Sequence, residues 1–364
     1  MAVVWLLTVF AAVYLVQRGA FRLWGEKGIR YERSFSAPYA FAGQRVTLNE
    51  TLTNGKPLPL PWIRIETMMP SMLRFGSPGS EMAVSSGQLL QNHASLFSLP
   101  PFTKVRRKHE VLCAHRGVYR LSSLTCTFGD LLGTPAGTLA LTADCEIAVL
   151  PAIREAARLP VSVRQFMQSS LGHPEAFRED HYQIAGIRAY RSGDSMKQVN
   201  WSATAKTGQL LVNKRESMVD NDAIVLLNAE LLDAAENRRV PPEAFEEAVS
   251  FAASVIHHLV NSGGKAGLVF NGQAGERRDV PLRVEPRAGR EHLFALLRLM
   301  AEFEPVVRRE LAYVLEELAA SGLRNANVLL ISAFLTPKQR MLVDRLRQSG
   351  NRVETLLLYR EAIA

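Results

Sequence analysis

The first 17 residues, Met1 to Gln17, carry no charged side chain and read MAVVWLLTVFAAVYLVQ. An α-helix of that length is about 25 Å long, close to the thickness of the hydrocarbon layer of a bilayer. The run lacks the basic start and the small-residue cleavage site that a secretory signal peptide needs. It therefore predicts a transmembrane anchor over residues 1–24, and a buried N-terminal helix is the alternative.

Basic residues dominate the chain directly after this run. They are Arg18, Arg22, Lys27, Arg30 and Arg33, against Glu26 and Glu32. The positive-inside rule then predicts a single-pass protein of the cell membrane, with the bulk of the chain in the cytoplasm. Over all 364 residues, 43 Lys and Arg against 35 Asp and Glu give a net charge of +8. This mild excess permits contact with an anionic membrane surface and is weak evidence for nucleic-acid binding.

Composition excludes several protein classes. Hydrophobic residues make up 47% and charged residues 21% of the chain, which is typical of globular proteins and argues against disorder and collagen. The odd number of cysteines, with no close pair, argues against a disulfide scaffold and predicts reduced thiols in a reducing compartment. These are Cys113, Cys126 and Cys145.

Residues 30–150 show short apolar runs that alternate with polar residues and are separated by Gly, Pro and Asn. Val46 and Leu48 follow a period of two, as do Ile63 and Ile65. Such a pattern predicts an antiparallel β-sandwich of immunoglobulin-like size. The polar stretch SPGSEMAVSSGQ predicts a loop or an exposed hairpin tip.

From about residue 217 to residue 364 the period changes. Buried strands such as AIVLL, GLVF and NVLLIS alternate with helical segments, among them a long one that begins near Pro241. Alternating strands and helices predict an α/β domain with a mostly parallel sheet. Residues 151–216, between the two regions, are irregular and rich in charge, and we predict that they form a separate segment. Within it, the stretch VRQFMQSS is either a short helix or a loop.

Motifs for known chemistry are scarce in this sequence. It contains neither a phosphate-binding loop nor the G-x-S-x-G turn of serine hydrolases. His109, Cys113 and His115 share one face if they lie on a strand, but zinc usually takes four ligands and no second pair follows nearby. The alternative of a metal site there is therefore weak.

The most distinctive segment surrounds Trp201. Its candidate interaction residues are Arg188, Tyr190, Gly193, Asp194, Lys197, Trp201, Ala205 and Lys206. The Gly193-Asp194 turn can direct the carboxylate back toward Arg188 as an ion pair, and VNWSATAK predicts a short helix. Two interpretations are open: a recognition surface for a partner, or a polar brace between domains in which Trp201 is a buried plug. The residues alone favour the brace.

This segment resembles the signature of the family called domain of unknown function 58. The family pattern is roughly G-x-R-x-Y-x-x-G-D-x-x-R-x-I-x-W-x-x-S-A-R, and this chain has G-I-R-A-Y-R-S-G-D-S-M-K-Q-V-N-W-S-A-T-A-K from Gly186 to Lys206. Lys197 and Lys206 stand in place of arginines, and a lysine cannot supply an arginine's bidentate contact. Upstream, RGVYRLSSLTCTFGDLLG is similar to a strand pair of the family, with Leu131 and Leu132 in place of Pro and Phe.

The resemblance implies a membrane-anchored protein with a β-sandwich and a C-terminal domain similar to von Willebrand factor type A. It also implies partners, because genes of such proteins typically sit beside those of MoxR-type AAA+ ATPases and of other membrane-anchored proteins. No established enzymatic activity defines the family. We therefore expect a protein that is not an enzyme and that holds no cofactor.

A type A domain suggests a further test. Its metal site needs D-x-S-x-S after the first strand, so that a carboxylate and two hydroxyls can bind a hard cation. This chain has Asn228, Ala229 and Glu230 at the start of that stretch, and no hydroxyl. We therefore expect a degenerate site without metal at Asn228, Glu230 and Ser332. The crevice at the strand ends, which Asn271 would also line, remains the default place for a ligand.

Three functions are compatible with the sequence. The first is a membrane-anchored interaction module that works with a MoxR-type ATPase. The second is a hydrolase with an unrecognised site, although no nucleophile and base stand out. The third is a nucleic-acid binder, which is disfavoured because acidic residues interrupt the basic ones through most of the chain. We expect no nucleic-acid partner.

Overall fold

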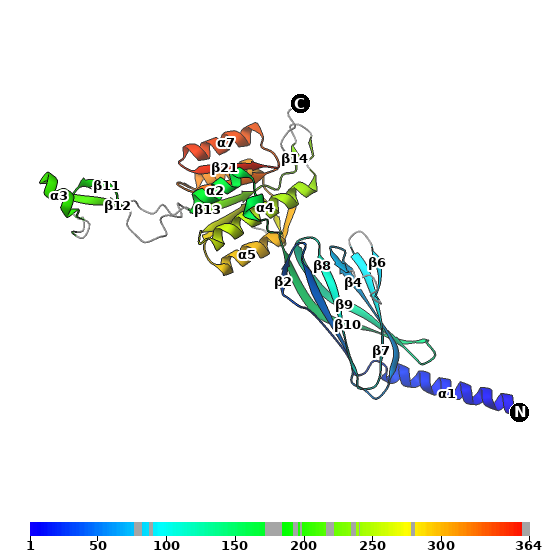
Figure 1. Cartoon of the computed structure of the whole chain (residues 1–364). Helices are drawn as coiled ribbons and strands as arrows, with labels where there is room; N and C mark the ends of the chain where they lie inside the picture. Colours follow the sequence, from blue (N-terminus) through cyan, green and yellow to red (C-terminus); the bar gives the residue numbers. More distant parts are fainter. Residues whose placement is uncertain are drawn as a thin grey trace. The chain divides into compact units, whose positions relative to one another are not determined.

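The structure, a computed structural model, describes ten stretches of the chain. They are residues 1–75, 82–86, 90–171, 184–191, 196, 199–215, 222–233, 238–239, 241–277 and 281–358. The chain divides into two compact units (Figure 1). The first comprises Met1–Ala152 with Leu297–Glu302, and the second comprises Ile153–Leu296 with Phe303–Ala364.

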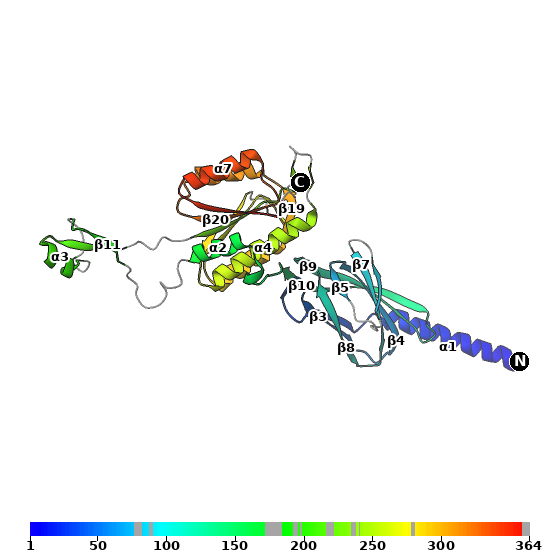
Figure 2. The ribbon, with the colours of Figure 1, turned by 45° about the horizontal axis from the view of Figure 1, so that its top comes forward.

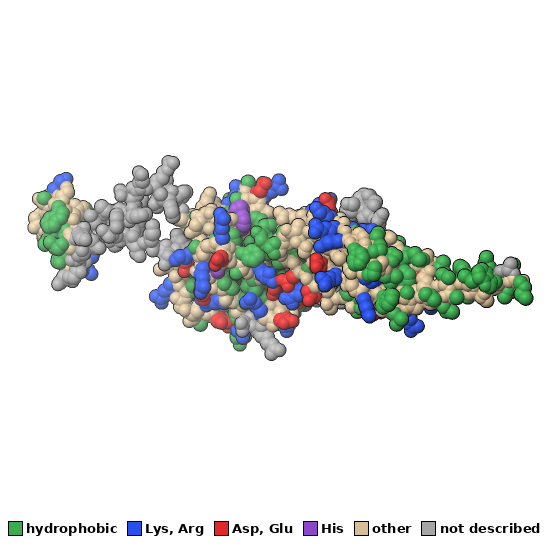
Figure 3. All heavy atoms as spheres, turned by 90° about the horizontal axis from the view of Figure 1, so that it is seen from below, with side chains coloured by type: hydrophobic (Ala, Val, Ile, Leu, Met, Phe, Trp, Pro, Cys, Tyr) green, Lys and Arg blue, Asp and Glu red, His purple; other side chains and the backbone are tan. Residues whose placement is uncertain are grey.

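The first unit begins with helix α1 (Ala2–Trp24). The part from Val3 to Trp24 has a mean hydropathy of 1.6 and is long and apolar enough to cross a membrane. Hydrophobic side chains cover this helix on the face seen in Figure 3. The expected apolar N-terminal helix is therefore present. Most of its apolar side chains are exposed, whereas the alternative, a core helix of a soluble protein, would bury them.

Two β-sheets follow and pack face to face (Figures 1 and 2). One has the order β1 (Ile29–Phe35), β3 (Arg45–Asn54), β8 (Lys104–Cys113), β5 (Leu73–Phe75). The other has the order β2 (Tyr39–Phe41), β10 (Pro135–Leu150), β9 (Gly117–Gly129), β4 (Leu60–Pro70), β7 (Leu90–Leu99), β6 (Met82–Ser86). All pairs are antiparallel except β10 with β2. The chain thus forms the expected sandwich of two sheets.

Strand β3 shows why the sandwich forms. Every second residue points into the core, as the period of two requires, and Leu48 and Leu52 are 0% and 1% exposed. Glu50 occupies the position between them and is 3% exposed. The same alternation that builds the apolar core therefore also buries a carboxylate.

The buried carboxylate of Glu50 accepts hydrogen bonds from both neighbouring strands. Its Oε1 lies 2.8 Å from the hydroxyl of Tyr31 on β1, and its Oε2 lies 3.1 Å from Nε2 of His109 on β8. Burial by itself would raise the pKa of Glu50, but the contacts with His109 and Tyr31 outweigh it and hold that pKa below its usual value. Burial and the Glu50 charge together raise the pKa of Tyr31.

Two more basic groups lie in the same interior. Arg33 is 7% exposed and donates from Nε to the carbonyl of Ala143 at 2.6 Å. His93 is 2% exposed, and burial lowers its pKa to about 4. We call Tyr31, Arg33, Glu50, His93 and His109 the sandwich cluster.

The second unit contains a five-stranded sheet with the order β18-β16-β13-β20-β21. The strands are β18 (Leu282–Arg287), β16 (Ala266–Phe270), β13 (Ala223–Leu227), β20 (Asn327–Ser332) and β21 (Arg352–Leu357). All neighbours are parallel except β18, which is antiparallel to β16. The prediction of a mostly parallel α/β sheet is therefore confirmed.

Helices cover both faces of this sheet. Helices α2 (Val161–Leu171) and α4 (Pro242–Asn261) contact one face. Helices α6 (Leu311–Ala320) and α7 (Pro337–Gln348) share a core with Ile224 and Leu226, which point toward the other face. The remaining elements are η1 (Ala156–Arg158), α5 (Arg290–Ala301), β14 (Leu232–Asp233), β15 (Arg238–Arg239), β17 (Gly272–Ala274) and β19 (Phe303–Val307).

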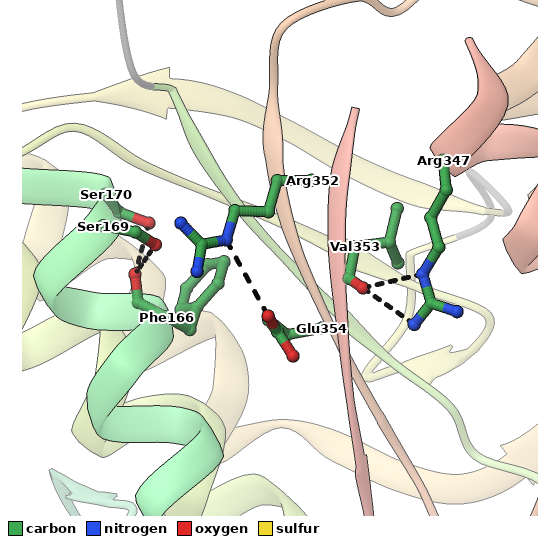
Figure 4. A network of polar contacts seen from close by, with 7 residues as sticks. All are labelled: Phe166, Ser169, Ser170, Arg347, Arg352, Val353 and Glu354. Carbon is green, nitrogen blue, oxygen red and sulfur yellow. Dashed lines mark hydrogen bonds and ion pairs between the residues drawn. The ribbon is translucent and has the colours of Figure 1, made fainter. Parts of the chain in front are cut away.

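Strand β21 is an edge of the sheet, and a side chain of helix α7 bonds to it (Figure 4). Arg347, in the last turn of α7, donates from Nε and a terminal nitrogen to the carbonyl of Val353 at 3.1 and 2.9 Å. A free edge carbonyl invites pairing with another chain. Arg347 therefore both closes α7 onto the sheet and occupies part of this edge.

The structure decides between alternatives in two stretches. In residues 151–216, the stretch VRQFMQSS lies in α2, which agrees with the helical alternative, whereas the strand pair described below was not expected. The apolar alternation in this part is too short to stand out from its charged surroundings. Within the stretch SPGSEMAVSSGQ, residues Met82–Ser86 form strand β6, which pairs antiparallel with β7 as the hairpin alternative requires. The rest of the stretch lies outside the described residues.

Candidate functional site

Three parallel strands of the second unit end in polar residues at the same edge of the sheet. Asn228 follows β13, Asn271 follows β16, and Ser332 closes β20. Their exposed fractions are 2%, 0% and 0%. The structure therefore brings together the predicted positions Asn228 and Ser332, and Asn271 lies on the other side of Asn228.

These side chains bind one another. The Asn228 amide donates from Nδ2 to Ser332 Oγ at 2.8 Å and accepts at Oδ1 from Asn271 Nδ2 at 2.8 Å. Asn271 Oδ1 accepts from the backbone N–H of Ala229 at 2.7 Å, and the Ser332 hydroxyl donates to the carbonyl of Phe334 at 2.5 Å. Since buried polar groups must be paired, each bond offsets the cost of burying the next group.

Glu230 extends this network to two helices. Its Oε1 accepts from the backbone N–H of Leu311, the first residue of α6, at 2.6 Å. Its Oε2 accepts from Nε2 of Gln339 on α7 at 2.8 Å. A carboxylate at a helix N-terminus is favoured by the helix dipole. We call Asn228, Glu230, Asn271, Ser332 and Gln339 the strand-end network.

The donor chemistry of the strand-end network does not suit a hard cation. Asn228 presents an NH₂ group, which cannot ligate a metal, to Ser332, and both carboxylate oxygens of Glu230 already accept hydrogen bonds. Within the described part of the chain, no three His, Cys, Asp or Glu residues lie close enough to hold a metal ion. What the arrangement can do is tie three strand ends to the starts of α6 and α7.

Sequence reasoning missed one member of this network, Gln339. The signal was available, because Thr336 and Gln339 have the spacing of a helix capping box. In the structure Thr336 accepts from the backbone of Gln339, and the Gln339 Oε1 accepts from the backbone of Thr336 at 2.9 Å. The capping box fixes the start of α7 and leaves Nε2 of Gln339 for Glu230.

The weak metal alternative around His109 is not supported. His109 contacts Glu50 across the strand pair rather than a thiol. Cys113 is 0% exposed, and burial raises its pKa to about 11, so that it stays a neutral thiol at neutral pH. The two side chains therefore serve the interior of the sandwich.

The signature segment folds as a strand pair with a short helix. Strand β11 (Ile184–Ala189) pairs antiparallel with β12 (Leu211–Arg215), and helix α3 (Trp201–Thr207) lies between them in sequence. The Asn200 side chain caps α3 by accepting from Ala203 N at 3.0 Å. After α3, Gly208 adopts a left-handed φ of 70°, which a glycine allows at little cost.

Trp201 is exposed, which contradicts its expected role as a buried plug. Its exposed fraction is 61%, and every residue of α3 is at least partly exposed. The small core of the segment is instead formed by Val199 and Val212, at 6% and 0% exposure. A seven-residue helix capped by Asn200 has too little surface to cover an indole ring as well.

The other candidate interaction residues fall into two groups. Arg188 and Tyr190 are partly exposed, and Ala205 and Lys206 are exposed on α3. Arg188 donates to the carbonyl of Ala189 at 3.2 Å. The remaining candidates, Gly193, Asp194 and Lys197, lie outside the described residues, and so does the expected pair between Arg188 and Asp194.

Known proteins resemble this chain in sequence. "Uncharacterized protein YeaD" of Bacillus subtilis is 24% identical over 97% of this chain and 81% of its own length. "Uncharacterized protein Rv1480" of Mycobacterium tuberculosis is 29% identical over 41% of this chain, which is 46% of its own length. A cohesin from Archaeoglobus fulgidus covers 33% of this chain and 91% of its own, at 10% identity, with a TM-score of only 0.24.

The family comparison agrees with the signature. It covers the signature segment and the α/β sheet, from Gly186 to about the end of β21. The strand-end network lies within the same range. Residues 186–360 of this chain match the family "Protein of unknown function DUF58".

Proposed function

We propose that this chain is a membrane-anchored interaction module that binds a protein partner through its signature segment. Helix α1 supports the anchor, because it is apolar over 22 residues and lies near the N-terminus. The basic residues that follow the uncharged run favour a cytoplasmic location for the bulk of the chain. A MoxR-type AAA+ ATPase is the partner that the family resemblance implies.

One observation carries the proposal: the signature segment exposes large apolar side chains although it is small. Ile187, Met196, Trp201 and Leu210 are 51%, 55%, 61% and 44% exposed. Tryptophan is the residue type that most often dominates the energy of a protein–protein interface. An exposed tryptophan among other apolar side chains therefore suits a binding surface better than a structural brace.

Charge indicates the kind of partner. Residues 184–215 contain six basic residues and one acidic residue, which gives 6 − 1 = +5. Complementary charge at the rim of an interface speeds association and selects the partner. The segment therefore suits an apolar patch with an acidic rim on another protein.

The two alternative functions remain testable beside this one. A basic segment with exposed aromatic rings is also found in proteins that bind single-stranded nucleic acid. A hydrolase would need a nucleophile near a base, and the strand-end network offers amides, a hydroxyl and a carboxylate that are bound to one another. We favour the protein partner because the exposed side chains are chiefly aliphatic.

The test is capture of partners from membranes by the tagged full-length chain. The variants are Trp201→Ala and a matched control, Tyr313→Ala, an aromatic residue on α6 that is 62% exposed. We expect an AAA+ ATPase to be enriched with the wild type and the control and lost with Trp201→Ala. The melting temperature should stay unchanged in both variants.

Three outcomes would contradict the proposal. If Trp201→Ala retains the ATPase as well as Tyr313→Ala does, the signature segment is not the binding surface. If Trp201→Ala lowers the melting temperature clearly, Trp201 is a structural residue and the brace interpretation returns. Binding of single-stranded nucleic acid that depends on Trp201 would favour the third function instead.

A further inference from the structure

The end of the sandwich that receives α1 is tightly built. Phe21 on α1 is 2% exposed and belongs to the same apolar core as Phe128 on β9. A Cβ atom at Gly25 would stand 2.2 Å from the Phe128 ring, so only glycine fits there. Lys56 donates from Nζ to the carbonyls of Gly25 and Lys27 at 2.5 and 2.8 Å. The exit of α1 from the sandwich is therefore fixed by buried contacts.

The turn between β9 and β10 lies beside α1 (Figures 1 and 2). Its first residue, Asp130, is 1% exposed and senses the positive charge of Arg18. Arg18 is the first charged residue after the uncharged run that ends at Gln17. The turn therefore reaches the level of the helix at which the hydrocarbon layer would give way to the headgroups.

Two leucines in this turn, Leu131 and Leu132, are exposed. The Asp130 carboxylate accepts from the backbone N–H groups of Leu132 and Thr134 at 3.0 and 2.9 Å, and Gly133 has a φ of 81°. Burial alone would raise the pKa of Asp130, but the bonds from Thr134 and Leu132 outweigh it and keep the carboxylate ionised. Leu131 and Leu132 are 65% and 55% exposed. The turn is thus rigid, and its apolar side chains do not fold back onto the core.

A second turn at the same end exposes a phenylalanine. Phe102, between β7 and β8, donates its backbone N–H to the carbonyl of Lys56 at 3.3 Å, and Lys56 in turn binds the end of α1. Its side chain is 71% exposed. Its φ of 52° lies in the left-handed region, which costs an aromatic residue conformational energy that glycine would not pay. Folding alone gives no reason for an exposed aromatic side chain here.

We propose that Leu131, Leu132 and Phe102 insert into the headgroup boundary of the bilayer that α1 crosses. Single exposed leucines are common on proteins, but these side chains stand at turn tips around the exit of an apolar helix. Hydrophobic atoms also continue from α1 onto the adjacent part of the sandwich in Figure 3. The occupant is lipid rather than protein, because the same helix level presents Arg18 and Arg22 to lipid phosphates.

The proposal rests on the membrane anchor of the proposed function. It adds a defined orientation of the sandwich relative to the bilayer. With α1 alone in the membrane, the sandwich would be a tethered body above the surface. With the two turns inserted, the end of the sandwich that receives α1 contacts the lipid headgroups. The membrane then sets the orientation of the first unit.

Spin labels on the full-length chain in phosphatidylcholine–phosphatidylglycerol vesicles test this. Labels are placed at Leu131→Cys, at Leu132→Cys as a second reporter, and at His115→Cys in the exposed β8–β9 turn at the other end of the sandwich. Leu7→Cys reports on the anchor. Burial raises the pKa of Cys113 and Cys126 to about 11 and also raises that of the partly buried Cys145, so the new exposed thiol reacts first at neutral pH. The wild-type chain measures the background, to which Cys145 contributes.

The measurement is the accessibility of each label to oxygen, which concentrates in lipid, and to a nickel chelate, which stays in water. We expect the oxygen-to-chelate ratio at Leu131 and Leu132 to exceed that at His115 several-fold. If both leucine labels match His115 while Leu7 is in lipid, the turns do not insert and the anchor stands. If Leu7 is also in water, the anchor and this inference both fail.

Discussion

The two units bury polar side chains in their interiors by different chemistry. The sandwich cluster is titratable, with the Glu50 carboxylate between Tyr31 and His109. At the centre of the strand-end network, Asn228 and Asn271 are neutral amides that bind each other. A buried charge must keep its partners, whereas a neutral network loses only the bonds that are removed. The first unit is therefore expected to be the more sensitive to single substitutions and to acid.

The largest effect is expected for Glu50→Ala. It leaves Tyr31 and His109 buried without their shared acceptor, and removing one member of a buried pair typically costs about 3–5 kcal/mol of unfolding free energy. Urea unfolding measures the loss, and hydrogen exchange of peptides from residues 30–150 locates it. The matched control is Glu110→Ala, whose pair with Arg45 is 58% exposed on the Glu110 side and is worth about 0–1 kcal/mol. Equal losses for both variants would remove the contrast between buried and exposed pairs.

A smaller loss is expected for Asn271→Ala. It leaves the buried Ala229 N–H without its acceptor, at about 1–3 kcal/mol. It also removes one of the two donors to Asn228 Oδ1, which still accepts from the Glu230 N–H. The loss should be the same at pH 7 and pH 5, because neither amide titrates. Urea unfolding at both pH values checks this, with Gln348→Ala, an exposed amide residue on α7, as the control. A strongly pH-dependent loss would show that the two interiors do not differ as described.

Acid should destabilise the sandwich through His93. The pKa of His93 is lowered from 6.5 to about 4 by burial, with the charge of Glu50 opposing the shift and that of His109 adding to it. Between about pH 6.5 and pH 4, His93 is therefore protonated in the unfolded chain but neutral in the folded chain. Stability is complete above pH 6.5 and falls as the pH drops toward 4, by about 1 kcal/mol between pH 6.5 and 5.5.

The variant His93→Phe separates this effect from other acid effects. Phenylalanine fills the space beside Phe75, whose ring centroid lies 4.3 Å from that of His93, and it does not titrate. Melting curves at pH 6.5 and 5.5 should therefore differ less for the variant than for the wild type. An identical pH dependence in both proteins would assign the acid sensitivity elsewhere.

The smallest effect is expected on adding a divalent cation. Titration calorimetry of the wild type with Mg²⁺ or Mn²⁺ should give no saturable heat, because Glu230 already accepts bonds from Leu311 and Gln339. The melting temperature should stay the same with and without the cation. Micromolar binding that disappears in Glu230→Ala would overturn this assignment.

Periodicity alone predicted the architecture of both units. The alternation around Val46 and Leu48 became strand β3, and the switch to strands with intervening helices gave the parallel sheet. The three strand ends could also be placed, because parallel strands end at one edge. The pattern of one strand does not show which residue of another strand its side chains will contact. Nothing near Glu50 in the sequence indicates that it will bind His109, which is 59 residues away.

The burial of Trp201 was predicted wrongly for a related reason. A tryptophan in a polar stretch is usually buried, but this expectation assumes a neighbouring domain large enough for the side chain to pack against. The segment instead completes its own small core with Val199 and Val212. Whether a side chain is buried depends on the size of the folding unit, which the local sequence does not state.

The signature segment has one further property that follows from its strand pairing. Ile184, the first residue of β11, stands opposite Arg215, the last residue of β12. The first and last residues of the segment 184–215 therefore lie side by side, so this segment is a cassette whose two ends meet. Such a cassette can be exchanged between relatives, or replaced by a short glycine linker, without altering the span that the flanking chain must bridge. Under the proposed function, binding specificity can in this way change while the α/β sheet keeps its sequence.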